Sequence, residues 1–332
     1  MKIWNLPVAE IMPYSAIEER RPVALLTSGP AWTAVRRHLQ QLNIVCQKEV
    51  VEASLAHWDN LVVDLQRALS TAHVDDYAIY AVGGGLVADA AKYVAVNLDK
   101  QLTCLPTALS VDAFITWASG YRKDGCVYYL ETKPPDCLIL DFDVLAAAPP
   151  SIRAAGICDV LSIATGSWDW QFAHERGKNP HNMPFIPYVY DAAQAILQGA
   201  LDCAEAAGQG DPDGLKQLYD CLAMEVQLCN QIGHSRPEEG SEHYFAYAVE
   251  NTMGKGLPHG DLVGPAILLI AEKQGCLTPP LRAALEACQI PLANIPVGVI
   301  TTTLQQLPAY AQKHNLPYGI AHELGTTKPP NY

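Results

Sequence analysis

The distribution of apolar and polar positions changes partway along the chain. In the first part, short apolar runs alternate with stretches of helical periodicity; the runs cover residues 22–27, 44–51, 77–82 and 102–105, and the helical stretches cover 31–42, 55–72 and 86–98. Short apolar runs bounded by turn residues are typical of buried strands, and apolar residues spaced three or four apart are typical of amphipathic helices. This alternation predicts an α/β domain with a mainly parallel sheet.

The pattern becomes helical after a short transition. Residues 121–130 predict a hairpin around Asp124 and Gly125, and residues 137–141 predict one more strand. After Pro149 and Pro150 the strand pattern largely stops, and helical patterns cover 151–174, 188–208, 214–233, 241–252, 260–274 and 279–288. We therefore predict a domain boundary near residue 148, with an α/β domain over 1–148 and an all-helical domain over 149–332.

Composition and charge narrow the class of protein. The 332 residues are 49% hydrophobic and 17% charged, which allows a large core, and the net charge of −13 argues against nucleic acid or an anionic membrane as partner. Residues 1–7 lack the apolar core of a signal peptide, and no stretch has the length of a membrane span. The ten cysteines contain no C-x-x-C pair, which favours reduced, mostly buried thiols over a disulfide framework. These features predict a cytoplasmic enzyme.

Two histidines flank a predicted helix break. His243 and His259 are sixteen positions apart, roughly 24 Å along one unbroken helix, which is too far for both to bind one ion. Gly254, Gly256 and Pro258 lie between them and are typical of a helix end and a new start. The two imidazoles can then converge from adjacent helices, although either could also be an ordinary packed or surface histidine. Glu242 is expected to point away from the face of His243 and to have a supporting or structural role.

A glycine-rich turn follows the predicted strand 77–82. Gly83, Gly84 and Gly85 stand between that strand and a helix, where the backbone can approach a pyrophosphate and the helix N-terminus can bind it. The spacing is not that of the G-x-G-x-x-G fingerprint, and a tight turn without ligand is the alternative. Asp89 and Lys92, three apart on one helix face, can pair with each other or contact a ligand.

Two further segments carry polar groups at informative places. Thr107, Ser110 and Asp112 follow the predicted strand 102–105, where ligands of α/β sheets gather, although a helix cap is an equally good interpretation. Asp159 is a single acid in a mostly apolar helical context, where a carboxylate needs a metal, a salt bridge or a cap. The segment Trp168–Trp170, by contrast, is interpreted as packing.

Taken together, these motifs resemble the iron-containing alcohol dehydrogenase/dehydroquinate synthase-like superfamily. The motifs are Gly83-Gly84-Gly85 with Asp89 and Lys92, Pro106-Thr107 with Ser110 and Asp112, Gly156 with Asp159, the segment Ser235–His243, and His259-Gly260. Within the superfamily, Ser235–His243 and Asp169–Ala173 resemble the glycerol-1-phosphate dehydrogenase branch.

The resemblance implies a fold, a ligand set and a substrate site. The fold would be a dinucleotide-binding α/β domain over 1–148 and a helical metal-binding domain over 149–332, with the site in the cleft. Metal ligands would be Asp159, His243 and His259, holding Zn²⁺ or alternatively Fe²⁺ or Ni²⁺. The nucleotide, NAD or NADP, would contact Gly83, Gly84, Gly85, Asp89, Lys92, Thr107 and Ser110. Asp112 would contact the substrate, and Arg236 is our candidate for binding a substrate phosphate, because a guanidinium matches phosphate bidentately.

The chain departs from the family pattern near the substrate. Cys158 replaces a glycine, Asp261 replaces a glutamate, Tyr247 replaces a histidine, and the segment 315–324 contains none of the expected arginine. These departures concern the phosphate of the substrate more than the metal or the cofactor. The first predicted strand ends without an acid, so neither NAD nor NADP is preferred.

The leading hypothesis is a metal-dependent NAD(P) oxidoreductase of a small polyol or polyol phosphate, with glycerol 1-phosphate and dihydroxyacetone phosphate as the first pair. One alternative is a glycerol or other polyol dehydrogenase without phosphate. A second alternative is a cyclising lyase like dehydroquinate synthase, although the sequence shows no evident cluster of basic residues to bind its substrate. A third is a non-catalytic binding protein. The expected partner is the small-molecule substrate, and self-association into a homo-oligomer is left open.

Overall fold

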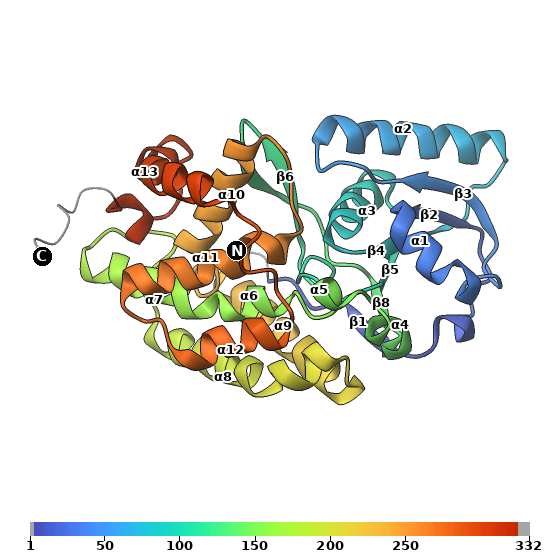
Figure 1. The fold of residues 1–332 in the computed structure, drawn as a ribbon. Helices are drawn as coiled ribbons and strands as arrows, with labels where there is room; N and C mark the ends of the chain where they lie inside the picture. The colour runs from blue at the N-terminus through green and yellow to red at the C-terminus, as the bar shows by residue number, and fades with distance from the viewer. Residues whose placement is uncertain (1–2, 325–332) are drawn as a thin grey trace, which may run out of the picture.

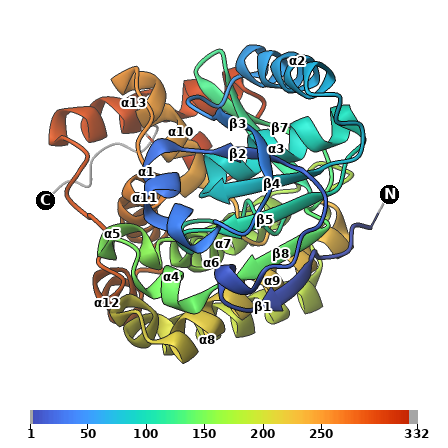
Figure 2. The same cartoon turned by 90° about the vertical axis from the view of Figure 1, so that its right-hand side faces the viewer.

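A six-stranded sheet forms the framework of the first part of the chain. The structure is a computed structural model that describes residues 3–324. The strand order is β1-β8-β5-β4-β2-β3, and every neighbouring pair is parallel. The strands are β1 (Val8–Ile11), β2 (Val23–Thr27), β3 (Ile44–Glu49), β4 (Ala78–Gly83), β5 (Leu102–Pro106) and β8 (Cys137–Leu140). Figure 2 shows them side by side.

Helices cover both faces of this sheet. The central strands β2 and β4 are buried along their whole length, as apolar strands covered on two faces must be. Ala24 and Leu26 pack with the apolar stripes of two long helices, whereas Val23 and Leu25 pack on the opposite face. The elements involved are α2 (Leu55–Thr71) and α3 (Gly85–Leu98) on one face, and η1 (Tyr14–Ala16), α1 (Gly29–Val35) and η2 (Arg36–His38) associated with the other.

A two-stranded hairpin stands apart from the main sheet. Strands β6 (Ala118–Lys123) and β7 (Cys126–Glu131) pair antiparallel around Asp124 and Gly125. Both turn residues have positive φ, 52° and 76°, which is the geometry that a two-residue hairpin turn requires. The predicted hairpin is therefore confirmed, and it lies beside α10 in Figure 1.

The remainder of the described chain is helical (Figure 1). It comprises α4 (Phe142–Ala146), α5 (Pro150–Arg153), α6 (Ile157–Leu161), α7 (Ile163–Glu175), α8 (Pro187–Gln209), α9 (Pro212–Ile232), α10 (Ser241–Met253), α11 (His259–Gln274), α12 (Pro279–Ala287), α13 (Val297–Lys313) and η3 (Ile320–His322). The prediction of a parallel α/β part followed by a helical part is confirmed. The predicted helix 151–174 is wrong in detail, because it is interrupted near Gly156 and Ser162 into three short helices.

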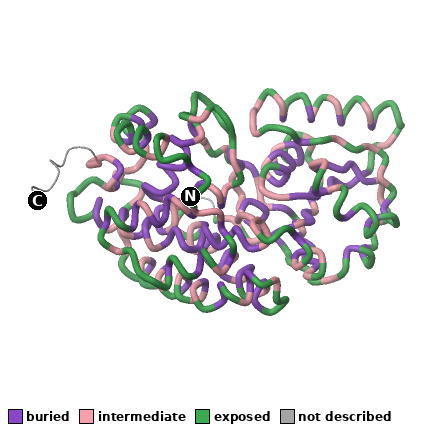
Figure 3. The backbone as a smooth tube through the Cα atoms, viewed as in Figure 1, coloured by how far each residue is buried: buried purple, intermediate pink, exposed green. Residues whose placement is uncertain are grey.

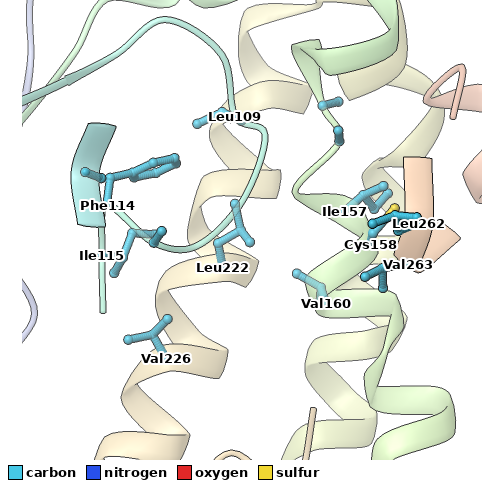
Figure 4. Close-up of a cluster of buried hydrophobic side chains, with 14 of the residues drawn as sticks. Leu109, Phe114, Ile115, Ile157, Cys158, Val160, Leu222, Val226, Leu262 and Val263 are labelled. Carbon is cyan, nitrogen blue, oxygen red and sulfur yellow. The ribbon is translucent and has the colours of Figure 1, made fainter. Parts of the chain in front are cut away.

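One apolar core links the two parts. It runs from β2, β4 and β5 through the segment after β5 to helices α6, α8, α9, α10 and α11. Figure 4 shows its centre, where Leu109, Phe114 and Ile115 lie near Leu222 and Val226 of α9, and where Ile157 and Val160 of α6 lie near α11. Figure 3, which colours the backbone by burial, shows buried residues in both parts of the molecule. The two parts are thus packed together where the candidate site residues gather.

Two further features concern the cysteines and the hydropathy of the helices. All ten cysteines are free thiols in the structure. Among residues 3–324, none of the helices combines the length and the hydropathy that crossing a lipid bilayer requires.

Candidate active site

A cleft of about 1150 Å³ opens where the helical part meets the sheet. Its walls come from the β4–α3 turn, the segment after β5, the β6–β7 hairpin, the end of α9, the first turns of α10 and the start of α11. These segments lie between the sheet and the helices in Figure 1. The carboxyl ends of β4 and β5 therefore face the helices that carry the predicted metal ligands, as in other open α/β sheets with ligand sites.

Three residues from three helices converge in this cleft. Asp159 comes from α6, His243 from the first turn of α10 and His259 from the first residue of α11. One ligand atom from each lies within 4.8 Å of the other two, and His259 Nε2 is 2.8 Å from Asp159 Oδ1. All three line the cleft. The structure thus brings together the residues predicted from sequence as metal ligands.

The interruption between helices α10 and α11 brings the two histidines together. Helix α10 ends at Gly254, whose φ of 65° is the left-handed conformation that glycine adopts readily, and Pro258 caps the start of α11. The reversal allows His259 to return to the ring of His243, with ring centroids 5.3 Å apart. The predicted helix break is confirmed.

Asp159 is held by its surroundings. Its neighbours Ile157, Cys158 and Val160 are buried in the common core, so the helix that carries the carboxylate is fixed by packing. The backbone N–H of Asp112 donates a hydrogen bond of 2.9 Å to Asp159 Oδ2, while Oδ1 faces His259. The carboxylate is therefore oriented toward the histidines.

His243 is oriented by the residue that precedes it. Its Nδ1 lies 2.9 Å from Glu242 Oε1, which also accepts a hydrogen bond from the backbone of Gly240. The expectation that Glu242 points away from His243 is wrong, because the first-turn geometry lets this carboxylate fold back to the ring. Although burial acts against it, the contact with Glu242 raises the pKa of His243 to about 9. Nδ1 is occupied, so Nε2 remains for an ion.

This donor set fits a divalent metal. Two imidazoles and one carboxylate are the protein ligands of many catalytic zinc centres, in which the remaining position takes water or substrate. Their ligand atoms are close enough to share one ion, and the cleft leaves one side of the group accessible. Iron and nickel accept the same nitrogen and oxygen donors, so the donor set does not select among the three metals.

The glycine-rich turn forms the opposite wall. Gly84 and Gly85 line the cleft, and Gly84 caps the N-terminus of α3. Gly83 does not line the cleft; its φ of 156° and a Cβ position only 2.8 Å from Val87 Cγ2 leave little room for a side chain. The turn therefore presents backbone N–H groups to the cleft, as a pyrophosphate site requires.

The remaining residues predicted at the nucleotide divide into two groups. Ser110 and Asp89 line the cleft, whereas Thr107 and Lys92 do not. Lys92 is fully buried; its ammonium donates to the carbonyls of Ala113, Thr116 and Ala118 and lies 3.1 Å from Asp89. Lys92 thus holds the segment after β5 and pairs with Asp89. Its side chain does not face the cleft and so does not reach a cofactor bound there.

Asp112 lies at the junction of the two walls. It lines the cleft, and burial, with the charge of Asp159 adding to it, raises the pKa of its carboxyl to about 7. A carboxyl with such a pKa can hold or release a proton near neutral pH, which suits a group that contacts a substrate hydroxyl.

Arg236 does not reach the cleft. Its guanidinium is 2% exposed and donates to the hydroxyl of Tyr244 and to the carbonyl of Tyr318. The expectation that Arg236 binds a substrate phosphate is therefore wrong, because the side chain is enclosed between α10 and the segment before η3. It holds the C-terminal segment against α10.

Sequence reasoning missed several residues of the cleft. Tyr129 of the hairpin lines it, as do Glu238 and Glu239, which lie in the turn between α9 and α10. Tyr247 also lines the cleft and lies next to His243, with ring centroids 6.1 Å apart. The consecutive acids in Ser235–Ser241 were a usable signal, because two charges beside a ligand histidine rarely face only the core.

Comparison with known proteins gives a consistent picture. Residues 12–149 match the family model described as iron-containing alcohol dehydrogenase. The chain is 30% identical over 252 residues to a glycerol-1-phosphate dehydrogenase (NAD(P)+) of Sulfurisphaera tokodaii, covering 76% of this chain and 70% of that protein. A protein of the same name from Sulfolobus acidocaldarius is 29% identical over 222 residues, covering 67% of this chain and 62% of the relative's length.

A solved structure reproduces the fold over nearly the whole chain. The probable glycerol dehydrogenase of Sinorhizobium meliloti superposes with a TM-score of 0.67 at 17% identity, covering 99% of this chain and 95% of the other. At this identity the similarity concerns the fold alone.

Proposed function

This chain belongs to the iron-containing alcohol dehydrogenase family, in the branch of the glycerol-1-phosphate dehydrogenases, and we propose that it interconverts a small polyol or polyol phosphate with its ketone. It is an enzyme of the oxidoreductase class that uses NAD(P) and a metal. Glycerol 1-phosphate and dihydroxyacetone phosphate form the first substrate pair to test, because the relatives are named for the former. The observation that carries the proposal is the convergence of Asp159, His243 and His259 opposite the Gly84 turn.

Zinc is the metal we propose for the triad, with iron or nickel as alternatives. A bound ion would supply Lewis-acid chemistry for the substrate oxygen, and a bound nicotinamide would supply the hydride chemistry. The balanced reaction is alcohol plus NAD(P)⁺ to ketone, NAD(P)H and a proton. Asp159, His243 and His259 would hold the ion, and Glu242 and the Asp112 N–H orient His243 and Asp159 for this.

Other residues of the chain position the reactants. The Gly84–Gly85 turn and Ser110 would hold the nucleotide phosphates at the start of α3. The Asp112 carboxyl would contact a substrate hydroxyl and, with a pKa of about 7, hold a proton that is released to solvent. The enclosing walls place both reactants in one orientation, which converts their encounter into an effectively intramolecular step.

The test is a substrate panel with purified holoenzyme. Glycerol, glycerol 1-phosphate, dihydroxyacetone and dihydroxyacetone phosphate are assayed with NAD(H) and NADP(H), before and after removal of metal. We expect absorbance changes at the nicotinamide band with at least one pair, loss on chelation and recovery with Zn²⁺. Activity that persists after complete metal removal would refute the assignment of the triad.

A further inference from the structure

We propose that the part of the cleft beside His243 accepts a hydroxyl or ammonium group of the substrate and rejects a phosphate. The inference rests on the proposed function and names the class of substrate. It is carried by four residues that face this region, namely Tyr129, Glu238, Glu239 and Tyr247.

A hydrogen-bonded chain fixes the direction of the protons in this wall. Glu239 Oε1 accepts a hydrogen bond of 2.8 Å from the Tyr247 hydroxyl, and its Oε2 accepts one of 2.6 Å from Ser235. The Tyr247 oxygen lies 2.9 Å from the Tyr129 hydroxyl. Because the hydrogen of Tyr247 is committed to a carboxylate, the hydrogen of Tyr129 must point to Tyr247. The Tyr129 oxygen therefore has only acceptor sites left for a ligand.

Glu238 adds a second acidic group to this wall. Its carboxylate lines the cleft, and its enclosed Oε2 has no hydrogen-bond partner in the structure. Behind it, Glu225 of α9 is 1% exposed, and neither of its carboxylate oxygens has a partner. Burial raises the pKa of both carboxyl groups well above the ordinary value of glutamate; the charge of Glu238 adds to this at Glu225, and the charges of Asp112 and Asp159 add to it at Glu238.

Few cations of the cleft are available to bind a phosphate. Among the described residues that line the cleft, seven are acidic, and Arg122 and Lys255 are the only lysine or arginine residues. Arg122 lies 3.3 Å from Glu250, and Lys255 is exposed in the loop that follows α10. The buried Lys92 and Arg236 do not line the cleft, and their charged groups donate hydrogen bonds to carbonyl and hydroxyl oxygens of the protein.

These observations select the chemistry of the ligand. A phosphate dianion offers acceptors only, so it would face Tyr129 Oη and the Glu239 carboxylate, which accepts from Tyr247 and Ser235, without a hydrogen to share, and like charges would repel. A hydroxyl can donate to either oxygen, and an ammonium can donate to both while neutralising charge. A site that is built to accept hydrogen bonds discriminates strongly against a group that cannot donate them.

Three substrates with one carbon skeleton test this. Glycerol, 3-amino-1,2-propanediol and glycerol 1-phosphate differ at one terminus, which is neutral, cationic or dianionic. Their kcat/KM values are measured for the wild-type holoenzyme, for Glu239→Gln, which lets an amide donate to Tyr247, and for Glu238→Gln. Glu131→Gln is the matched control, because Glu131 is exposed on the same hairpin and does not line the cleft. Calorimetric titration of the three compounds onto holoenzyme reads the same preference without turnover.

We expect wild type to prefer glycerol or the amine over glycerol 1-phosphate by on the order of 100-fold. Either glutamine variant should narrow this ratio by about tenfold, mainly by improving the phosphate, whereas Glu131→Gln leaves it unchanged. A wild-type preference for glycerol 1-phosphate, or glutamine variants that change all three substrates equally, would overturn the inference and leave the proposed function intact. Absence of nicotinamide turnover with any polyol would instead refute the proposed function, while the titrations would still decide the ligand preference.

Discussion

The substitution Asp169→Asn tests how the metal-bearing helices are held. Asp169 lies on α7 and is fully buried. Its Oδ2 accepts hydrogen bonds from the backbone and hydroxyl of Ser241, and its Oδ1 accepts from Ile320 N at 2.8 Å and Gln274 Nε2 at 3.1 Å. One carboxylate therefore joins the start of α10, the end of α11 and η3. Ser241 is two residues before the ligand His243.

Two opposing terms set the size of the effect. Asparagine keeps one acceptor oxygen and turns an NH₂ group toward a pair of donors, so two of the four hydrogen bonds are lost, at roughly 1.5–3 kcal/mol each to a charged group. Burial raises the pKa of Asp169 to about 6 from 3.8. Keeping the carboxylate ionised at pH 7 thus costs about 3 kcal/mol, which asparagine avoids. The net destabilisation should be about 2 kcal/mol.

The assay is thermal unfolding of wild type, Asp169→Asn and the exposed control Asp191→Asn on α8, with metal content measured in parallel. We expect a loss of about 4 °C for Asp169→Asn and no change for the control. Because the folded pKa is raised, wild type gains stability as the pH falls from 6 toward 4, and the gap to the variant should widen by about 1 kcal/mol between pH 7 and pH 5. An unchanged melting temperature together with normal metal content would refute this account.

Three other outcomes follow from the same geometry. Asp159→Ala should abolish metal binding and lower kcat/KM roughly 1000-fold, and a normal metal content by elemental analysis would show that the third ligand is wrong. Gly83→Ala, which places a Cβ 2.8 Å from Val87, should raise the KM for the nicotinamide cofactor about tenfold with little change in metal content; an unaltered cofactor KM would contradict a phosphate role for the turn. Since the pKa of His243 is about 9 and an ion needs the neutral ring, the apparent Zn²⁺ affinity in competition with a chelator should rise about tenfold per pH unit between pH 7 and 8, and a flat profile would mean that no proton is displaced.

Much of the fold was predictable because its elements are long or strongly patterned. Helices such as α2, α8 and α9 carry an apolar stripe over many turns, and the strands β2 and β4 are continuous apolar runs. Strand β1 was missed, because it has four residues, all exposed, and pairs only at the edge of the sheet. Helix α13 was missed as well, since Thr301–Thr303 are β-branched and Pro308 lies inside it; tertiary packing of one face overrides these local preferences.

The candidate site was predictable where its residues stand in motifs. The two histidines around a glycine-rich break and the acid in an apolar helix made a metal site an open possibility, and the resemblance to the family joined the three as one ligand set. Arg236 shows the limit of this approach, because residue type suggested a phosphate ligand while its direction depends on the packing of Tyr244 and Tyr318. The hydrogen-bonded pair of Tyr129 and Tyr247 joins residues 118 positions apart, and no local pattern reports such a contact.

The β6–β7 hairpin separates a residue of the substrate wall from the elements that carry the metal ligands, and this affects how each can evolve. Metal ligands sit on helices locked into the common core, where substitutions are constrained by packing, whereas Tyr129 sits on a two-stranded excursion outside the main sheet. Tyr129 is 54% exposed, so this position can change with less effect on the core than the metal ligands. Substitutions in the β6–β7 hairpin and in the turn between α9 and α10 can therefore change which alcohols bind. The metal ligands on the core helices stay the same.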